Sequence, residues 1–336
     1  MDVKNLLASF ISVAFAAAAS TLIINYYFER ENNEKRKLLS ERLSGHPLGS
    51  SLSRLDLNQH EIEVLACLIN PRDIASTFDD IGGLDDIIQD VKDTIFLPLE
   101  QHESVDMSQF TLPKGILLYG PPGTGKTMLA KAIAKESGYF FLNINDSLIE
   151  SKFYGETGKL LTAIFTLAEK LQPVIVFFDE IDGIVGTRSA TTTDYNISKK
   201  SVLLQLWDGI KDSKIIIIGA TNRINAIDEA FLRRMPKRIR INLPDVTSRE
   251  NILRKMLKDR HDPNFDFKLL AQKTQGYSGS DLQNLTSEAL NLALRSAIKS
   301  KERIEIRVTH EHINRVVQNQ IKNNSHIQTE TVVAND

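Results

Sequence analysis

The chain has 336 residues, of which 42% are hydrophobic and 25% are charged, and its formal net charge is −2. This composition is that of an ordinary globular protein, and the length suggests two domains with an appended segment. The near-neutral charge excludes a broad basic face for nucleic acid, and the single cysteine, Cys67, excludes a disulfide framework and suits a reducing compartment.

The N-terminal segment is predicted to be a membrane anchor. No charged residue occurs from Leu6 to Ile24. A run of this length can cross a hydrocarbon core of roughly 30 Å, so we assign residues 1–28 to a transmembrane helix. Lys4 alone precedes the run, whereas five Lys and Arg residues follow it over 30–42. This bias predicts a single pass, with the N-terminus outside and the rest of the chain in the cytosol. A cleaved signal peptide is the alternative, although the run is long for one.

Residues 29–77 are predicted to form a juxtamembrane helix and a linker. The stretch 29–45 is charged and helix-prone, and a turn-rich hinge follows at 46–53. Apolar residues at helical spacing predict a further helix within 55–71, which Pro71 ends.

Beyond residue 78, short apolar runs alternate with helical patterns, which predicts an α/β domain with a doubly wound parallel sheet over 78–245. The runs VIVFF and IIII are apolar throughout, as is typical of parallel strands buried on both faces. The predicted strands cover residues 115–120, 139–144, 174–179, 215–221 and 238–243.

After Pro244 the pattern becomes helical, so residues 246–323 are predicted to form a small helical domain and 324–336 a flexible polar tail. The predicted helices cover residues 248–260, 266–273, 280–299 and 309–321.

A phosphate-binding loop is predicted where the strand at 115–120 ends. GPPGTGKT fits the pattern G-x-x-x-x-G-K-S/T, and a predicted helix follows it, as the motif requires. Its backbone N–H groups and the helix N-terminus favour phosphate, so Lys126 is expected to reach the β- and γ-phosphates and Thr127 to ligate Mg²⁺. The sequence therefore predicts ATP and Mg²⁺ as cofactors. The predicted binding residues of the loop are Gly120, Pro121, Pro122, Gly123, Thr124, Gly125, Lys126, Thr127 and Met128.

Two carboxylates are predicted to face these phosphates. The strand VIVFF delivers Asp179 and Glu180 at its carboxyl end, where ligands bind in open α/β sheets. Asp179 is expected to hold Mg²⁺, and Glu180 to polarise the attacking water as general base. Asn222 directly follows the run IIIIGAT, which is expected to be the strand next to that of Asp179, and its amide would orient the same water.

Arg233 and Arg234 follow a short predicted helix and have two interpretations. They could form a solvated basic face, or they could act as arginine fingers that reach a neighbouring subunit's γ-phosphate. The second interpretation requires an oligomer.

Taken in order, GPPGTGKT, FFDEID, GATNR, DEAFLRR and GYSGSDL resemble the AAA ATPase family over about residues 78–320. The resemblance implies an ATPase whose adenine is cradled by the backbone of Asp80, Ile81 and Gly82. It also implies that Gly279 and Ser280 belong to the point in the small domain that closes on the nucleotide.

Within the family, ATNRINAIDEAFLRRMPKRI, LQPVIVFFDEID and LLQLWDGI resemble the mitochondrial outer-membrane dislocases, the mitochondrial sorting protein or thorase group. The resemblance implies a membrane-embedded homohexamer that extracts mislocalised tail-anchored proteins through its pore. The membrane it implies is the mitochondrial outer membrane or the peroxisomal membrane.

The stretch SKFYGE places two adjacent rings, Phe153 and Tyr154, beside the turn-forming Gly155. For an isolated pair of aromatic residues, the simplest interpretation is a half-buried turn with one ring in the core. The resemblance instead implies a pore loop in which both rings grip an extended polypeptide through contact area. The polar stretch 186–198 is predicted to be a second pore loop, in which Arg188 and Tyr195 would touch substrate or merely face solvent.

Three other functions compete with this interpretation. A membrane-anchored AAA protease needs H-E-x-x-H, and the nearest match, HEHIN, ends in Asn314, so zinc proteolysis is rejected. A microtubule-severing ATPase shares the core, but roughly 50 residues between anchor and core are too few for an additional folded module. An ATP-switched membrane scaffold would not need the hydrolytic set of Glu180, Asn222 and Arg233.

Overall fold

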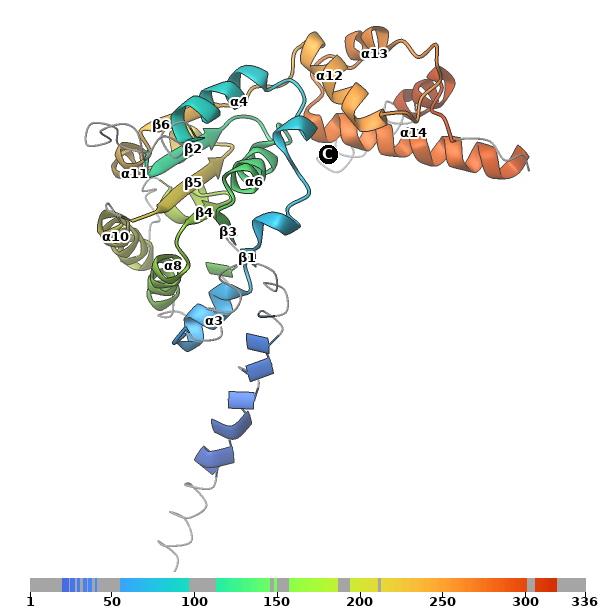
Figure 1. Cartoon of the computed structure of the whole chain (residues 1–336). Coiled ribbons are helices and arrows are strands. Elements are labelled where there is room, and N and C mark those ends of the chain that lie inside the picture. Colours follow the sequence, from blue (N-terminus) through green and yellow to red (C-terminus); the bar gives the residue numbers. More distant parts are fainter. Residues whose placement is uncertain are drawn as a thin grey trace, which may run out of the picture.

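The computed structural model of the chain has an α/β part that carries a sheet and a group of C-terminal helices that projects from one side of it (Figure 1). The structure describes residues 55–96, 113–145, 148–149, 157–186, 194–210, 213–300 and 306–318, together with scattered positions between 20 and 40.

Within the described residues the sheet has six strands in the order β1-β3-β4-β5-β2-β6. Neighbours from β3 to β6 pair in parallel, whereas β1 pairs antiparallel with β3. The prediction of an α/β fold with parallel strands is confirmed, but the sheet is mixed because of this edge strand. The strands are β1 (Leu68–Ile69), β2 (Gly115–Tyr119), β3 (Phe140–Ile144), β4 (Val174–Phe178), β5 (Ile215–Thr221) and β6 (Lys237–Arg240).

Successive side chains of the central strands enter two separate cores, one on each face of the sheet. Ile116 and Leu118 belong to one core and Leu117 to the other, as the two-residue period of a strand requires. Every residue of β4 and β5 is buried. Both faces must therefore be covered by helices, which explains why these runs are apolar throughout.

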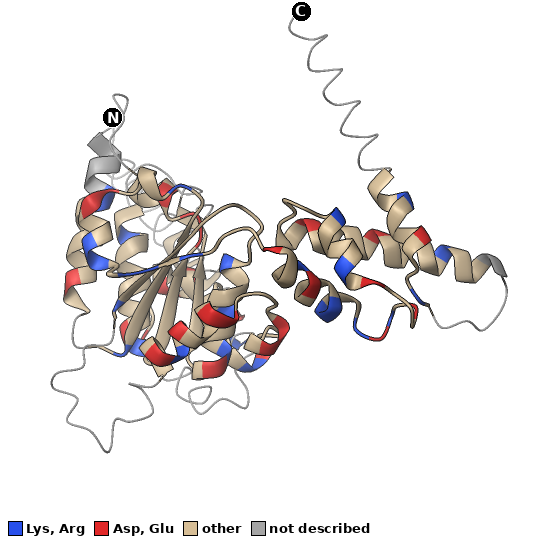
Figure 2. Ribbon diagram, turned by 90° about the horizontal axis from the view of Figure 1, so that it is seen from above, with Lys and Arg blue, Asp and Glu red and all other residues tan. Residues whose placement is uncertain are grey.

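The helices form a layer on each face. Apolar residues of α4 (Asp85–Val91) and α6 (Lys126–Ser137) line one core, and those of α8 (Thr157–Leu171) and α10 (Asp194–Gly209) line the other. Figure 2 shows the charged residues mainly on the helices, the loops and the edge strand β6, while strands β2 to β5 carry none. The absence of charge from β2 to β5 is what burial on both faces demands.

The C-terminal helices have a hydrophobic core of their own. It is built from α12 (Val246–Leu257), α13 (Phe267–Lys273), α14 (Gly279–Ser300) and a helix over 310–318. These helices match the predicted segments to within a few residues. No strand pairs with the sheet in this part of the described chain.

The helix predicted within 55–71 is shorter than expected. It is α3 (Gln59–Leu65), which begins at a capping box formed by Asn58 and Glu61. The chain then turns, and Ile69, expected on the helix, instead pairs with Phe141 as part of the edge strand β1. The prediction failed here because the open edge of β3 offers backbone partners that outweigh the helical spacing of the side chains.

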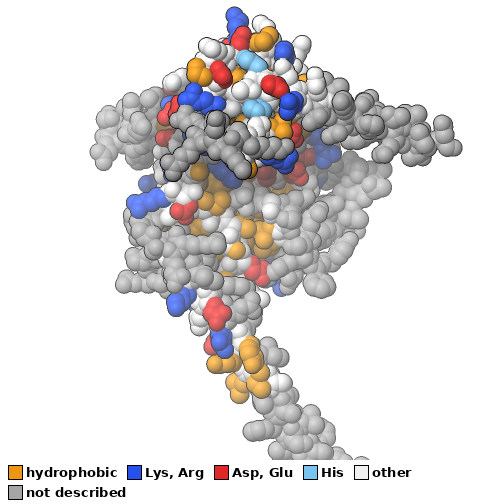
Figure 3. All heavy atoms as spheres, turned by 90° about the vertical axis from the view of Figure 1, so that its right-hand side faces the viewer, with side chains coloured by type: hydrophobic (Ala, Val, Ile, Leu, Met, Phe, Trp, Pro, Cys, Tyr) orange, Lys and Arg blue, Asp and Glu red, His pale blue; other side chains and the backbone are white. Residues whose placement is uncertain are grey.

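The N-terminal predictions fall largely outside the described residues. Most of the run from Leu6 to Ile24, the hinge at 46–53 and the tail at 324–336 belong to this group. Within the predicted anchor, Leu22, Ile23, Tyr26 and Tyr27 are 56–70% exposed, and Figure 3 shows apolar side chains along this stretch. Among the described residues, no helix has the length and apolar character that crossing a bilayer requires.

A buried ion pair fixes α3 to α8. The Glu61 side chain is 1% exposed, and the Lys170 ammonium lies 2.7 Å from both of its oxygens. Burial by itself raises the pKa of Glu61, but hydrogen bonds from Lys170, from the Asn58 backbone N–H and from Thr166 outweigh it, so the pKa lies below its usual value. The pair therefore stabilises the fold above about pH 4.3, the ordinary pKa of Glu, and this contribution is lost as the pH falls through the lowered pKa.

We expect Lys170→Met to lower the free energy of unfolding by about 2 kcal/mol at pH 7, because Glu61 is left charged and buried without its partner. The expected pH dependence also changes sign, since the unpaired carboxyl prefers its protonated form. The free energy of unfolding of the wild type should rise from pH 3 to pH 6, whereas that of the variant should fall over the same range. Urea unfolding at several pH values measures both effects.

Lys159→Met is the matched control, because Lys159 is an exposed residue of the same helix. If Lys170→Met and Lys159→Met unfold with the same midpoint and pH profile, the pair contributes nothing to the docking of α3.

Candidate functional site

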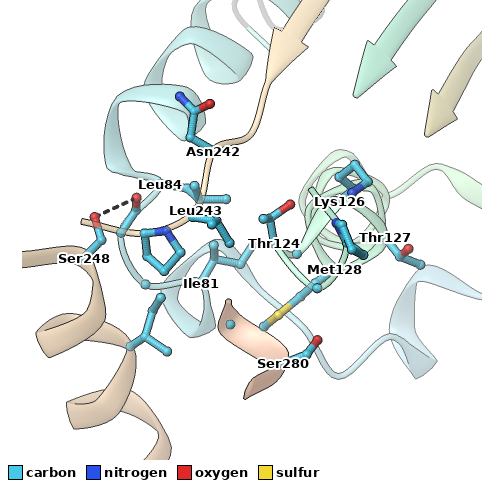
Figure 4. Close-up of a pocket in the computed structure, with 18 of the residues that line it drawn as sticks. Ile81, Leu84, Thr124, Lys126, Thr127, Met128, Asn242, Leu243, Ser248 and Ser280 are labelled. Atoms are coloured by element: carbon cyan, nitrogen blue, oxygen red, sulfur yellow. Dashed lines mark hydrogen bonds between the residues drawn. The ribbon is translucent and has the colours of Figure 1, made fainter. Parts of the chain in front are cut away.

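A cavity of about 880 Å³ lies between the α/β part and the C-terminal helices. This volume lies in the upper part of the range that is usual for small-molecule and cofactor sites. In Figure 4, Ile81, Leu84 and Leu243 lie together on one side, whereas Thr124, Thr127 and Met128 come from the loop and helix on the other. One end of the cavity is therefore apolar, and the other is built from polar loop residues.

The phosphate-loop motif forms the polar end. It connects β2 to α6, and residues 122 to 128 line the cavity; Gly120 and Pro121 are not among the lining residues that the structure describes. Gly123 has φ +73°, and a Cβ atom there would lie 2.7 Å from the Ser278 hydroxyl. The loop can therefore approach the start of α14 closely only because this position is glycine.

Lys126 is held by the loop itself. Its ammonium donates hydrogen bonds to the carbonyls of Gly120, at 3.0 Å, and Pro121, at 2.7 Å, and the residue is 8% exposed. Burial lowers the pKa of Lys126, and the nearby charge of Asp179 partly opposes this shift. A positive charge at this depth, on a loop followed by a helix N-terminus, creates a site suited to anions.

Asp179 and Glu180 follow β4 directly and line the cavity. The Thr127 hydroxyl donates to Asp179 Oδ2 at 3.0 Å, so the hydroxyl and the carboxylate that were expected to share a metal are already neighbours. Oxygen donors of this kind fit Mg²⁺. Glu180 has φ +51°, in the left-handed region, where a non-glycine residue is strained.

Asn222 follows β5, which pairs in parallel with β4, so its expected position one strand from Asp179 is observed. The turn before it is fixed by Asp182, whose carboxylate accepts from the Thr221 hydroxyl at 2.7 Å and from the Arg223 guanidinium at 2.8 Å. The role of Asp182 was not recognised from the sequence, because only the folded chain brings the two loops together.

Arg233 and Arg234 lie at the end of α11 (Glu229–Arg234), and neither is among the described residues that line the cavity. Arg233 is 73% exposed and pairs with Glu229 at 2.9 Å, whereas Arg234 pairs with Asp208 at 2.6 Å. Figure 1 places α11 on the side of the sheet away from α12. Both arginines therefore lie outside the site of their own chain.

The other walls come from both parts of the chain. Asp80, Ile81 and Gly82 line the cavity as expected. Gly279 and Ser280 line it from the start of α14, where the Ser280 N–H donates to the Gly123 carbonyl at 3.1 Å. Lining residues that were not predicted as site residues are Gly83, Leu84, Ile87, Ala220, Thr221, Arg240, Asn242, Leu243, Pro244, Asp245, Ser248, Ile252, Lys255, Met256 and Gln283.

The predicted substrate-gripping residues are mostly outside the described chain. Phe153, Tyr154, Gly155 and Arg188 fall there, so their placement is untested. Tyr195 was expected in a polar loop over 186–198, but the backbone at this residue belongs to α10, which begins at Asp194. The predicted loop therefore ends earlier than expected, because the helical segment extends further toward the N-terminus than the polar composition suggested, and contact of Tyr195 with substrate stays a prediction.

Family models match two parts of the chain. The model described as the ATPase family associated with various cellular activities (AAA) matches residues 116–243, and the AAA+ lid domain matches residues 264–313. The two matches correspond to the α/β part and to the C-terminal helices that enclose the cavity.

The relatives include a Homo sapiens protein named outer mitochondrial transmembrane helix translocase, which is 42% identical over 254 residues, 74% of this chain and 70% of the relative. A Danio rerio protein of the same name is 39% identical over 282 residues, 82% and 78% of the two chains. A Caenorhabditis elegans protein named mitochondrial sorting homolog is 36% identical over 308 residues, 89% of both chains.

The strain at Glu180 gives a stability prediction. Glu180→Gly should raise the free energy of unfolding by about 1 kcal/mol relative to Glu180→Gln, because glycine adopts a positive φ without the clash of a Cβ atom. Both variants lack the carboxylate, so the comparison isolates the backbone term. Parallel urea titrations of the two variants measure it, and a glycine variant less stable than the glutamine variant would contradict the strained conformation.

Proposed function

Because the chain belongs to the AAA ATPase family, we propose that it is an ATP-driven dislocase that extracts mislocalised tail-anchored proteins from the mitochondrial outer membrane. The observation that carries the proposal is the cavity, in which the phosphate loop, two carboxylates and an amide meet at the ends of three neighbouring strands beneath a helical lid. The name of the 42% identical relative supplies the type of substrate and the membrane.

The proposed cofactors are ATP and Mg²⁺, and ATP supplies the phosphoryl group whose transfer to water drives the cycle. Lys126 is proposed to exchange its two loop carbonyls for β- and γ-phosphate oxygens. Thr127 and Asp179 would hold Mg²⁺ between their oxygens, which already lie 3.0 Å apart. The backbone of Asp80, Ile81 and Gly82 would take the adenine at the apolar end of the cavity.

The hydrolytic roles follow from position at the strand ends. Glu180 is exposed at the cavity wall, where it would accept a proton from the attacking water. Asn222, one strand away, would hold the same water in line. We propose no part for Arg233 and Arg234 in their own chain's site, since neither lines it.

In a homohexamer, those arginines would reach the γ-phosphate of the neighbouring subunit as arginine fingers. The Arg233 side chain is 73% exposed and the Arg234 side chain 27%, and each pairs with a single acidic residue that it could leave on entering such an interface. The site of each subunit would then be complete only in the ring, which ties hydrolysis to assembly.

Motion would come from the two-part construction of the site. We propose a large ATPase domain over 78–245 and a small helical domain over 246–323, with the hinge at the Leu243–Pro244 segment that lines the cavity. Gly279 and Ser280 would form the contact between the small domain and the phosphate loop. Opening and closing of the lid would move the ring's pore loops, with Phe153, Tyr154 and Gly155 contacting the extended substrate.

The N-terminal segment over 1–28 is proposed to anchor the ring, with the ATPase on the cytosolic side and residues 29–77 as the tether. The same ring could serve the peroxisomal membrane. Pulling a transmembrane segment into water costs about 0.8 kcal/mol for each exposed CH₂ group, so a whole helix requires repeated cycles.

Glu180→Gln tests the hydrolytic assignment. The variant should bind ATP with wild-type affinity but hydrolyse it at least about 100-fold more slowly, because the amide cannot take the proton of the attacking water. Nucleotide binding and phosphate release, measured on the same preparation, separate the two effects. Hydrolysis at the wild-type rate would remove Glu180 from the mechanism.

Changing both Phe153 and Tyr154 to Ala tests the translocation assignment. Basal ATP hydrolysis should stay within about twofold of wild type, because neither ring belongs to the nucleotide site. Extraction of a tail-anchored protein from liposomes that carry the full-length chain should fall to background. Normal extraction by this double variant would show that the rings do not grip substrate.

A further inference from the structure

A lysine of the C-terminal helices holds the backbone of the segment that lines the apolar end of the cavity. Lys255, on α12, donates hydrogen bonds from its ammonium to the carbonyl of Asp79 and, at 2.8 Å, to the carbonyl of Ile81. Both are charge-assisted bonds, which are shorter and stronger than neutral ones. One side chain of the lid therefore fixes two carbonyls of the base-binding segment.

Close packing supports the same attachment. A Cβ atom at Gly82 would lie 2.9 Å from the backbone nitrogen of Ile252, and the Gly83 carbonyl accepts a hydrogen bond from Ser248 at 3.3 Å. Residues 79–83 thus lie directly on α12, and the carbonyls on either side of Asp80 are already occupied.

Within the described residues, the hydrogen bonds of this segment leave some of its backbone groups available to a ligand. The N–H groups of Asp80 and Ile81 donate to Thr77 and Phe78, at 3.2 and 3.1 Å. In the described segment 78–84, the Asp80 carbonyl and the Gly82 N–H have no hydrogen-bond partner among the described residues. Both residues line the cavity. An acceptor and a donor are therefore available close together at the wall.

This pair suits adenine and opposes guanine. Adenine presents its 6-amino donor beside the N1 acceptor, whereas guanine presents the O6 acceptor beside the N1–H donor. With guanine, the Asp80 carbonyl would face the O6 acceptor and the Gly82 N–H would face the N1–H donor, so neither could form a hydrogen bond. A site built to hydrogen-bond one edge rejects the other because its polar groups are left unpaired.

We infer that Lys255 is a positioning residue for the nucleotide base. By holding the carbonyls of Asp79 and Ile81, it keeps the Asp80 carbonyl and the Gly82 N–H aligned toward the edge of adenine, so selectivity for ATP over GTP depends on it. The inference rests on the proposed ATPase function and extends it to a residue of the lid. Base recognition then requires the lid to be in place, since the ammonium belongs to α12 and the carbonyls belong to the α/β part.

The test compares ATP, GTP and ITP as substrates of the purified full-length chain, its Lys255→Met variant and its Lys255→Arg variant. ITP carries the O6 and N1–H edge of guanine without the 2-amino group, so it separates edge reading from crowding. Lys268→Met is the matched control, because Lys268 is an exposed residue of α13 that does not line the cavity. Thermal unfolding of each variant is recorded alongside.

For Lys255→Met we expect KM for ATP to rise about tenfold, KM for GTP and ITP to change less than twofold, and kcat with ATP to stay within about twofold. Lys255→Arg, which keeps the charge and the donors, should recover most of the selectivity, and Lys268→Met should match wild type. Unchanged selectivity in Lys255→Met overturns the inference, and so does an equal loss of affinity for all three nucleotides. A wild-type chain that hydrolyses none of them would instead overturn the proposed function.

Discussion

The parallel pairing of β2, β5 and β4 is the constraint on which the site depends. These strands lie side by side with matched registers, so their carboxyl ends arrive at one edge of the sheet. Lys126, Asn222 and Asp179 each follow a different strand, and no local feature of the chain could bring them together. Because these strands are almost wholly buried, their positions are set by packing on both faces. The phosphate end of the cavity is consequently rigid.

The opposite wall is built differently, since the C-terminal helices have a separate core. The contacts between α12 or α14 and the α/β part include hydrogen bonds to backbone groups, such as Ser280 to Gly123 and Lys255 to Ile81, and the close packing of Gly82 on Ile252. Such contacts are worth far less than a shared hydrophobic core, so the lid can move while each part keeps its fold. A ligand that touches both walls adds the missing interactions. In the proposed cycle, occupancy of the cavity would therefore set the position of the C-terminal helices relative to the α/β part.

The sequence predicted those features that are encoded locally. Uninterrupted apolar runs such as IIII identified the buried strands, and the spacing of glycines and Lys126 identified the phosphate loop, because both signals lie within a few consecutive residues. The two-residue strand β1 was missed, since its only cause is the open edge of β3, distant in the sequence. Asp182 and Lys255 were missed for the same reason: each acts on a backbone segment that only the tertiary fold places beside it.

The strained backbone at Glu180 shows how the rigid end of the site orients its exposed carboxylate. On one side, the Asp179 N–H donates to Ile144 of β3 and its carboxylate is held by Thr127. On the other side, the Ile181 N–H donates to Ala220 of β5. Both neighbours of Glu180 are thus fixed to adjacent strands, and the turn between them is completed by a positive φ at the one residue that remains. The strain is sustained by the surrounding sheet, and its result is a side chain directed out of the core at the point where the cavity meets the strand ends.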